Sequence, residues 1–207
     1  MAISKSDRTR AQIIEGAIRA LSEGGVTGAT TRKIATACGV PLATLHYHFD
    51  SKSALLQAVL EALIEEMTRA LRDEVRESAD LDGSIEQLLR AAWRWVMQTR
   101  TLQIVQYELT LYALRDGADW LAERQYDAYV ELYYGFLQRA LGSTGELTPG
   151  DCKAVAQFML AGVDGLILQE LAKPNRARSK RNIEALIVAT QDYMRSLRAD
   201  RDRQARA

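Results

Sequence analysis

The sequence predicts an all-α protein of about nine helices, in which a small N-terminal three-helix domain precedes a larger helical body. Apolar residues recur at spacings of three and four along nearly the whole chain, which is the period of helices packed on one side. All three prolines lie where a helix would begin or end, so they interrupt none of the expected helices. We expect the domain boundary at residues 52/53, with a head at 1–52 and a body at 53–207.

The composition allows a packed core, because 47% of the 207 residues are hydrophobic. The net charge is zero, but residues 1–52 contain seven Lys or Arg and four Asp or Glu, so the head is mildly basic and the body equally acidic. This asymmetry fits a protein that contacts phosphate at one end only. The first ten residues are polar, and no unbroken apolar run reaches the roughly 18 residues that span a membrane. We therefore expect a cytoplasmic protein without a membrane partner.

Enzymatic chemistry is not indicated by the residues present. Cys38 and Cys152 are too far apart to suggest metal-ligand spacing, and reduced thiols are the simplest interpretation. Both histidines, His46 and His48, lie in the head, so the body has no imidazole for acid–base work. No nucleophile motif or phosphate-binding loop is present. We expect no catalytic residues, no cofactor and no metal site.

The first three helices are delimited by glycine, threonine and proline. The first helix should end at Gly24–Gly25, because glycine readily adopts the left-handed conformation of a helix C-terminus. Thr30 or Thr31 offers an N-cap hydroxyl for a short second helix that Gly39 stops. Pro41 suits the first turn of a third helix. A short helix, a glycine turn and another short helix form a helix-turn-helix.

The second helix of such a motif presents its N-terminal residues to base edges in the major groove. Ala43 and the methyl group of Thr44 suit contacts with thymine methyls. Tyr47 and His48 can reach phosphate oxygens, although His48 is equally suited to packing at a helix junction. Lys52, in the first turn of the next helix, is placed for another phosphate, where the helix N-terminus is also favourable.

The body is expected to consist of a long helix to about residue 79, three helical stretches near 84–99, 101–115 and 118–141, and two more helices. Residues 142–149 form the clearest break, and Thr148, Pro149 and Asp151 predict a capping box at the start of the next helix. That helix should end near residues 173–174, and the final helix should fray from about residue 200. On the long helix, three arginines alternate with four acidic residues, which favours ordinary solvated ion pairs. The arginines are Arg69, Arg72 and Arg76, and the acids are Glu65, Glu66, Asp73 and Glu77.

The segment TRKIATACGVPLATLHYHFDSK at residues 31–52, followed by Leu55–Leu56, resembles the TetR family of bacterial repressors. The resemblance covers roughly residues 10–60, about a quarter of the chain. Pro41, Ala43 and His46 replace the family's usual serine, glycine and tyrosine, which affects the expected base preference and not the fold. The resemblance implies DNA contacts from Thr31, Arg32, Leu42, Ala43, Thr44, His46, Tyr47, His48 and Lys52. It also implies dimerisation through the last two helices and an effector pocket among the middle ones.

The body holds all three tryptophans and seven of the eight tyrosines. An aromatic-lined cavity between helices is a typical ligand site in bundles, and ordinary core packing is the alternative for each residue. Glu108 and Asp164 lie in mostly apolar stretches, where an acid needs a partner: a ligand cation, an arginine or a backbone group. The candidate ligand contacts are Trp93, Met97, Tyr107, Glu108, Tyr112, Trp120, Tyr133 and Asp164.

The last two helices are the candidate dimer interface. Gly162 and Gly165 interrupt an apolar helix, which lowers helix stability but permits close approach of another helix. Two such helix pairs related by a two-fold axis would form a four-helix contact. The candidate interface residues are Phe158, Gly162, Leu166, Ile183, Leu186, Ile187, Thr190 and Met194.

Together these features predict a DNA-binding transcriptional regulator. We expect a repressor that binds a pseudo-palindromic operator as a homodimer and is released by a small, largely apolar or aromatic inducer. One alternative is an activator with the same fold, because the sequence does not say where the operator lies relative to a promoter. The other is a helical interaction protein without DNA binding, which the basic and polar residues at 31–52 disfavour.

Overall fold

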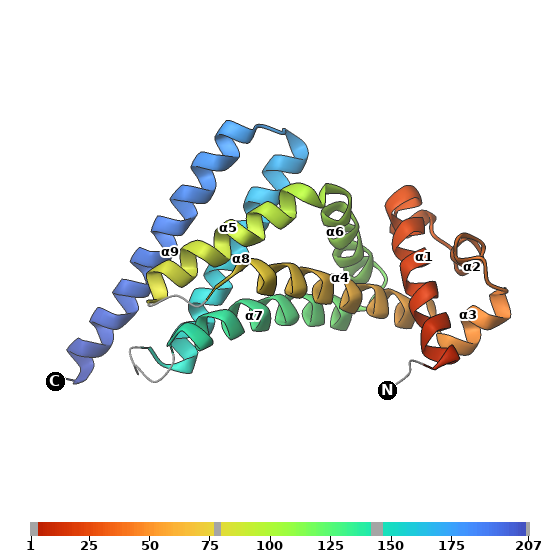
Figure 1. Ribbon diagram of the computed structural model, residues 1–207, viewed down its shortest axis with the longest axis horizontal. Helices are drawn as coiled ribbons and strands as arrows, with labels where there is room; N and C mark the ends of the chain where they lie inside the picture. The colour runs from red at the N-terminus through yellow and green to blue at the C-terminus, as the bar shows by residue number, and fades with distance from the viewer. Residues whose placement is uncertain (1–3, 77–79, 142–146, 206–207) are drawn as a thin grey trace. The chain divides into compact units, whose positions relative to one another are not determined.

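A computed structural model describes residues 4–76, 80–141 and 147–205, and this part of the chain forms nine α-helices (Figure 1). The all-α prediction is confirmed. The helices are α1 (Lys5–Gly28), α2 (Thr31–Cys38), α3 (Leu42–His48), α4 (Lys52–Glu74), α5 (Leu81–Gln98), α6 (Arg100–Arg115), α7 (Asp119–Leu141), α8 (Pro149–Ala172) and α9 (Arg176–Ala205).

The chain divides by its internal contacts into two compact units, which are described separately. Unit 1 consists of Met1–Glu66 and Thr101–Gln125, and unit 2 of Met67–Arg100 and Tyr126–Ala207. The boundary predicted at residues 52/53 follows the helix-turn-helix in the sequence. It stays a prediction of where the DNA-binding domain ends. The compact unit that contains this motif also includes the first part of α4, nearly all of α6 and the start of α7.

The termini of the first three helices follow from a few residues. α1 is interrupted at Gly25, where φ is 67° and ψ is 167°, and a further helical segment continues to Gly28. The Thr30 hydroxyl accepts a backbone N–H and caps α2, and Gly39 ends that helix in the left-handed conformation with φ 67° and ψ 29°. Pro41 is the extended N-cap of α3 rather than its first helical residue, because its ψ is 144°.

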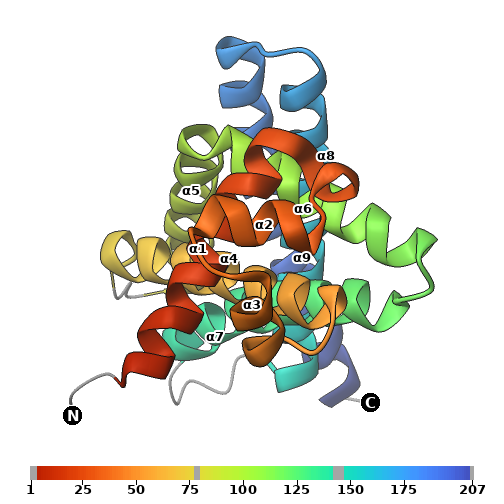
Figure 2. The same ribbon diagram turned by 90° about the vertical axis from the view of Figure 1, so that its right-hand side faces the viewer.

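The core of unit 1 joins α1, α2, α3 and the first half of α4 to α6 and the start of α7. Ile13, Leu45 and Leu109 are fully or almost fully buried in this one cluster, although they come from distant parts of the sequence. The helices α1, α2 and α3 can be followed in Figure 2. A Cβ atom on Gly16 would lie 2.9 Å from Cys38 Cα, so glycine is required where α1 meets α2.

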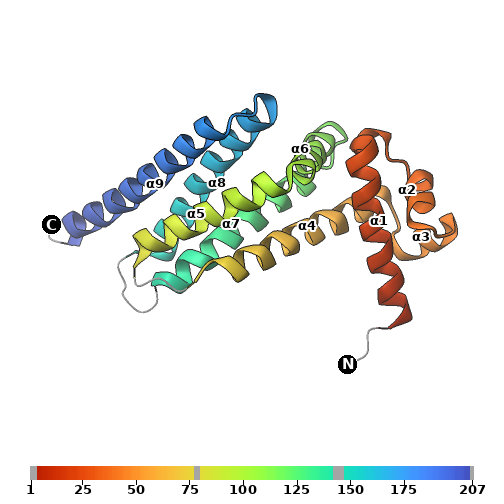
Figure 3. The same cartoon turned by 45° about the horizontal axis from the view of Figure 1, so that its top comes forward.

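Unit 2 is built around the antiparallel pair α8 and α9, which lie side by side in Figures 1 and 3 with α5 against α9. The predicted capping box is confirmed, since Thr148 and Asp151 each accept a backbone N–H from the other. Across α5 and α9, Arg90 Nη2 donates to Glu184 Oε2 at 2.6 Å.

By length and composition alone, α8 could cross a membrane. The core helix of a folded protein meets the same criterion, and Val155, Met159 and Val163 of α8 are buried within the chain. Packing within the chain therefore accounts for part of the apolar character of α8.

Candidate DNA-binding surface and effector-binding body

The two sides of α3 differ sharply in exposure. Leu45 is fully buried and anchors the helix in the unit 1 core. Ala43, His46 and Tyr47 lie on the opposite side and are exposed, and Tyr47 is 80% exposed. A large aromatic side chain so open to water is free to contact a partner. This surface has the composition that groove and phosphate contacts require.

The remaining predicted DNA contacts border this surface. Arg32, in the first turn of α2, is exposed, whereas Thr31, Leu42 and Thr44 are half-buried. His48 is half-buried and packs edge to face against Tyr47, with ring centroids 5.2 Å apart. His48 therefore has a packing partner next to the exposed surface. The DNA contacts of all these residues stay predictions.

Lys52 is held by contacts inside unit 1. Its Nζ donates to the Val26 carbonyl oxygen at 3.0 Å and lies 4.6 Å from the centroid of the Tyr112 ring. Burial lowers the pKa of Lys52, and the charge of Asp116 partly opposes this effect. Because an ammonium group has three donors, a phosphate contact remains compatible with this geometry and stays a prediction.

Glu108 of α6 has a backbone partner in the head. Its Oε2 accepts the Val26 N–H at an N–O distance of 2.9 Å, which matches the backbone alternative considered for this acid. Tyr112, one turn later, donates its hydroxyl to Asp116 and carries the Lys52 ammonium over its ring. Two residues predicted to contact a ligand therefore contact the end of α1 and the start of α4. Spacing along the chain offered no sign of this, since Glu108 and Val26 are 82 residues apart.

The other predicted ligand contacts fall in both units. In unit 1, Tyr107 is half-buried and Trp120 is exposed. In unit 2, Trp93 is buried and Met97 is exposed. The role of these four residues in ligand binding stays a prediction.

Asp164 of α8 lies with two tyrosines of α7 in unit 2. Burial raises the pKa of Tyr126 to about 12, with a further rise from the charge of Asp164 and a side-chain hydrogen bond to it. Burial, followed by the charge of Asp164, also raises the pKa of the fully buried Tyr133. Asp164 therefore has a tyrosine hydroxyl as a partner, which sequence reasoning missed because Tyr126 lies on a different helix.

The predicted dimer residues divide into buried and accessible ones. A Cβ atom on Gly162 would clash with Leu186 of the same chain, so this glycine serves the contact between α8 and α9. Leu166 is half-buried, while Phe158 is partly exposed and packs against Tyr193 with ring centroids 5.2 Å apart. The residues already buried within the chain are Ile183, Ile187, Thr190 and Met194. The large apolar side chains that α8 and α9 leave exposed are Phe158, Leu168 and Val188.

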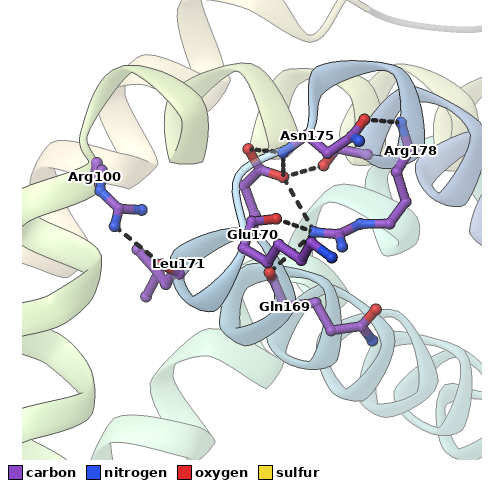
Figure 4. Close-up of polar contacts among 8 residues, drawn as sticks. Arg100, Gln169, Glu170, Leu171, Asn175 and Arg178 are labelled. Carbon is purple, nitrogen blue, oxygen red and sulfur yellow. Dashed lines mark hydrogen bonds and ion pairs between the residues drawn. The ribbon is translucent and has the colours of Figure 1, made fainter.

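A buried carboxylate fixes the turn between α8 and α9 (Figure 4). Glu170 accepts the backbone N–H of Asn175 at 3.1 Å and the hydroxyl of Ser179, and its Oε2 lies 3.8 Å from Arg178 Nη2. Burial would raise the pKa of Glu170, but these hydrogen bonds and the positive charges of Arg178 and Arg100 together lower it. The turn is therefore stabilised by an ionised glutamate.

Two family models match this chain. Residues 13–59 match the bacterial regulatory proteins of the tetR family, and residues 76–193 match the tetracyclin repressor-like C-terminal domain. The first match spans the helix-turn-helix and the second spans more than half of the chain. Proteins of this family are transcription regulators that bind DNA operators and small-molecule effectors.

Curated relatives match over almost the whole length. The HTH-type nicotine-responsive transcriptional repressor HdnoR of Paenarthrobacter nicotinovorans is 28% identical over 193 residues, which cover 93% of this chain and 98% of the relative. The HTH-type transcriptional regulator TtgR of Pseudomonas putida is 29% identical over 197 residues, covering 92% of this chain and 93% of the relative.

Solved structures agree with these matches. The multidrug binding protein EbrR in complex with imidazole is 27% identical, with a TM-score of 0.67 over 86% of this chain and 88% of that one. A TetR family member from Streptomyces coelicolor A3 has the same identity and TM-score over 86% of this chain and 95% of that one. The chain belongs to the TetR family of bacterial transcription regulators.

Proposed function

We propose that this regulator is a cytoplasmic repressor that binds a pseudo-palindromic operator as a homodimer, and that a small, largely apolar or aromatic molecule releases it. The observation that carries the proposal is the exposed surface of α3, where His46 and Tyr47 face outward above the buried Leu45. HdnoR, a relative over nearly the full length, is described as a repressor, which supports repression over activation.

The operator is tested by selecting bound sequences from random duplex DNA with the full-length protein. A dimer with two recognition helices related by a two-fold axis should select two inverted half-sites, with centres one helical turn or a multiple of it apart. A single, asymmetric half-site would contradict the proposed dimer. Enrichment of no sequence would contradict specific binding.

The proposed dimer contact uses the exposed apolar residues of α8 and α9. Leu168 and Val188 are 52% and 54% exposed, so Leu168→Glu and Val188→Glu should leave the chain folded. Burying a charge without a partner in an apolar contact is costly, so both variants should be monomeric by light scattering and lose operator affinity. Leu111→Glu, on the 52% exposed Leu111 of α6, is the matched control and should stay dimeric. Dimeric Leu168→Glu and Val188→Glu variants would remove this assignment.

The effector is tested by combining ligand binding with operator release. Names of two relatives support aromatic ligands: HdnoR is nicotine-responsive, and EbrR has been solved with ethidium. A ligand releases DNA only if it binds one conformation more tightly than the other. We therefore expect aromatic effectors, whether neutral or cationic, to raise the melting temperature of the protein and to lower its affinity for the operator. Compounds that stabilise the protein but leave operator affinity unchanged would contradict the proposed coupling.

A further inference from the structure

Unit 2 contains a pocket of about 520 Å³ between the last turns of α4, the start of α5 and the last turns of α7. Three arginines line it: Arg72 and Arg76 from the α4 side and Arg139 from α7. The apolar part of the wall comes from Val75, Phe136 and Ala140. None of these residues belongs to the aromatic set that the sequence predicts for ligand binding, so the pocket is a separate feature.

The described residues that line this pocket carry positive charges without a carboxylate to balance them. In the part of the chain that the structure describes, the guanidinium groups of Arg72, Arg76 and Arg139 also form no ion pair. Other arginines of the same unit do find partners, since Arg94 bonds Glu74 and Arg90 bonds Glu184. Three like charges gathered around one cavity repel each other, and an anion bound among them would remove that cost.

The surrounding contacts hold part of this arrangement in place. The Arg139 guanidinium lies 4.4 Å from the centroid of the Phe136 ring, so the ring supports its flat face while its edge N–H groups remain for an acceptor. The backbone N–H of Arg76 donates to Gln87 Oε1 at 3.1 Å, which fixes the chain as it leaves α4. Arg72 lies in the last turn of α4, and Arg76 follows the end of that helix, so the two arginines reach the pocket wall from either side of the helix end.

We propose that this pocket binds a small organic oxyanion, a carboxylate or phosphate ester attached to an apolar body. Arginine forks match the planar or tetrahedral oxygens of such groups and form charge-assisted hydrogen bonds with them. The volume lies within the range of small-molecule sites, and the apolar wall of Val75, Phe136 and Ala140 suits a hydrocarbon or aromatic body. A nucleic acid is a poorer fit, because its phosphates are read along an extended basic surface. The proposal does not depend on the proposed operator or inducer.

Calorimetric titration of the full-length protein tests the site with phenyl phosphate and benzoate, and with benzyl alcohol as the uncharged analogue. We expect saturable binding of at least one anion, weakening as salt is added, whereas any binding of the alcohol should be insensitive to salt. The better-bound anion distinguishes a phosphate ester from a carboxylate as the natural class. Arg72→Gln and Arg139→Gln should each lower the affinity about tenfold or more, the loss expected for a charge-assisted hydrogen bond.

Two further variants separate the pocket from general charge effects. Arg69→Gln removes the same charge from an exposed site one turn earlier on α4, outside the pocket, and should bind the anions like the parent protein. Ala140→Phe keeps all three arginines but fills the cavity, and should weaken binding of phenyl phosphate. Circular dichroism confirms that each variant is folded.

Several outcomes would overturn the site. These are no saturable binding of either anion, anion binding that Arg72→Gln and Arg139→Gln leave unchanged, or an equal loss in the Arg69→Gln variant. A further contrary outcome is that the Arg72→Gln and Arg139→Gln variants bind an unrelated DNA duplex more weakly while they bind the small anions like the parent protein. That outcome would assign the arginines to nucleic-acid binding and overturn the site.

Discussion

The carboxylate of Glu108 accepts the backbone N–H of Val26, and this hydrogen bond ties α6 to the end of α1. Removing the carboxylate in Glu108→Ala leaves a partly buried N–H without its acceptor, which costs about 1–3 kcal/mol. We expect a loss of this size in urea unfolding at a fixed protein concentration. Glu123→Ala, which truncates an exposed glutamate in the same unit, is the control and should change stability by less than about 0.5 kcal/mol. Equal stability of the two variants would show that the Val26 bond contributes nothing.

Adjacent glycines of α1 should respond to alanine in opposite directions. Gly24 has helical geometry, and a Cβ atom there would have no neighbour within 4 Å, so Gly24→Ala should stabilise the protein by about 0.5–1 kcal/mol. Gly25 has a φ of 67°, and a Cβ there would lie 3.0 Å from Glu108 Oε2. Gly25→Ala should therefore destabilise the protein by about 1–3 kcal/mol. Thermal and urea unfolding of the two variants measure the difference, and a shift of the same sign in both would contradict it.

Glu170 should make the stability of unit 2 depend on acid. Its pKa in the folded protein is lower than in the unfolded chain, so its stabilisation is complete at neutral pH. This stabilisation is lost as the pH falls below the unfolded value of about 4.3 and through the folded pKa. Glu170→Gln should be about 1–2 kcal/mol less stable than the parent at pH 7, with the gap closing in acid. Asp73→Asn, at an exposed aspartate of unit 2, should show no comparable gap, and a Glu170→Gln gap that persists unchanged at about pH 3 would contradict the ionised carboxylate.

Two residues of α3 should affect DNA binding in different ways. Because Tyr47 is 80% exposed, Tyr47→Ala should leave the unfolding midpoint unchanged and weaken operator binding on every sequence. Thr44→Ala should instead change which bases are preferred, since its methyl and hydroxyl groups face the groove in the proposed complex. Fluorescence anisotropy with the selected operator and single-base variants separates the two effects. Unchanged affinity in both variants would place the interface elsewhere.

The sequence was sufficient for the features that depend on neighbouring residues. The helix stop at Gly39 and the capping box of Thr148 and Asp151 are local, and the structure has both. The first helix was predicted to end at Gly24–Gly25, whereas α1 is only interrupted at Gly25 and continues to Gly28.

Contacts between segments that are distant along the chain could not be predicted from the sequence. The partners of Glu108 and Asp164 come from other helices, so no spacing along the chain could identify them. Arg72 and Arg76, which the sequence placed among solvated ion pairs, line a cavity that only the tertiary structure creates. Their predicted partner Glu77 lies outside the described residues. Gly162 was linked to close helix approach, and the structure shows that the helix it approaches is α9 of its own chain.

Each compact unit contains one buried cysteine, whose reaction with a thiol reagent can be followed. Cys38 is buried in unit 1, where its thiol donates to the Ile13 carbonyl, and Cys152 is buried in unit 2. Burial raises the pKa of both thiols, so neither should react with an alkylating reagent until its surroundings open. The rate of modification at each cysteine therefore measures how often that unit opens in the native protein, with no engineered probe. Saturating operator DNA should slow modification of Cys38 more than that of Cys152. Mass spectrometry of the modified protein would then measure how DNA binding affects the opening of the head.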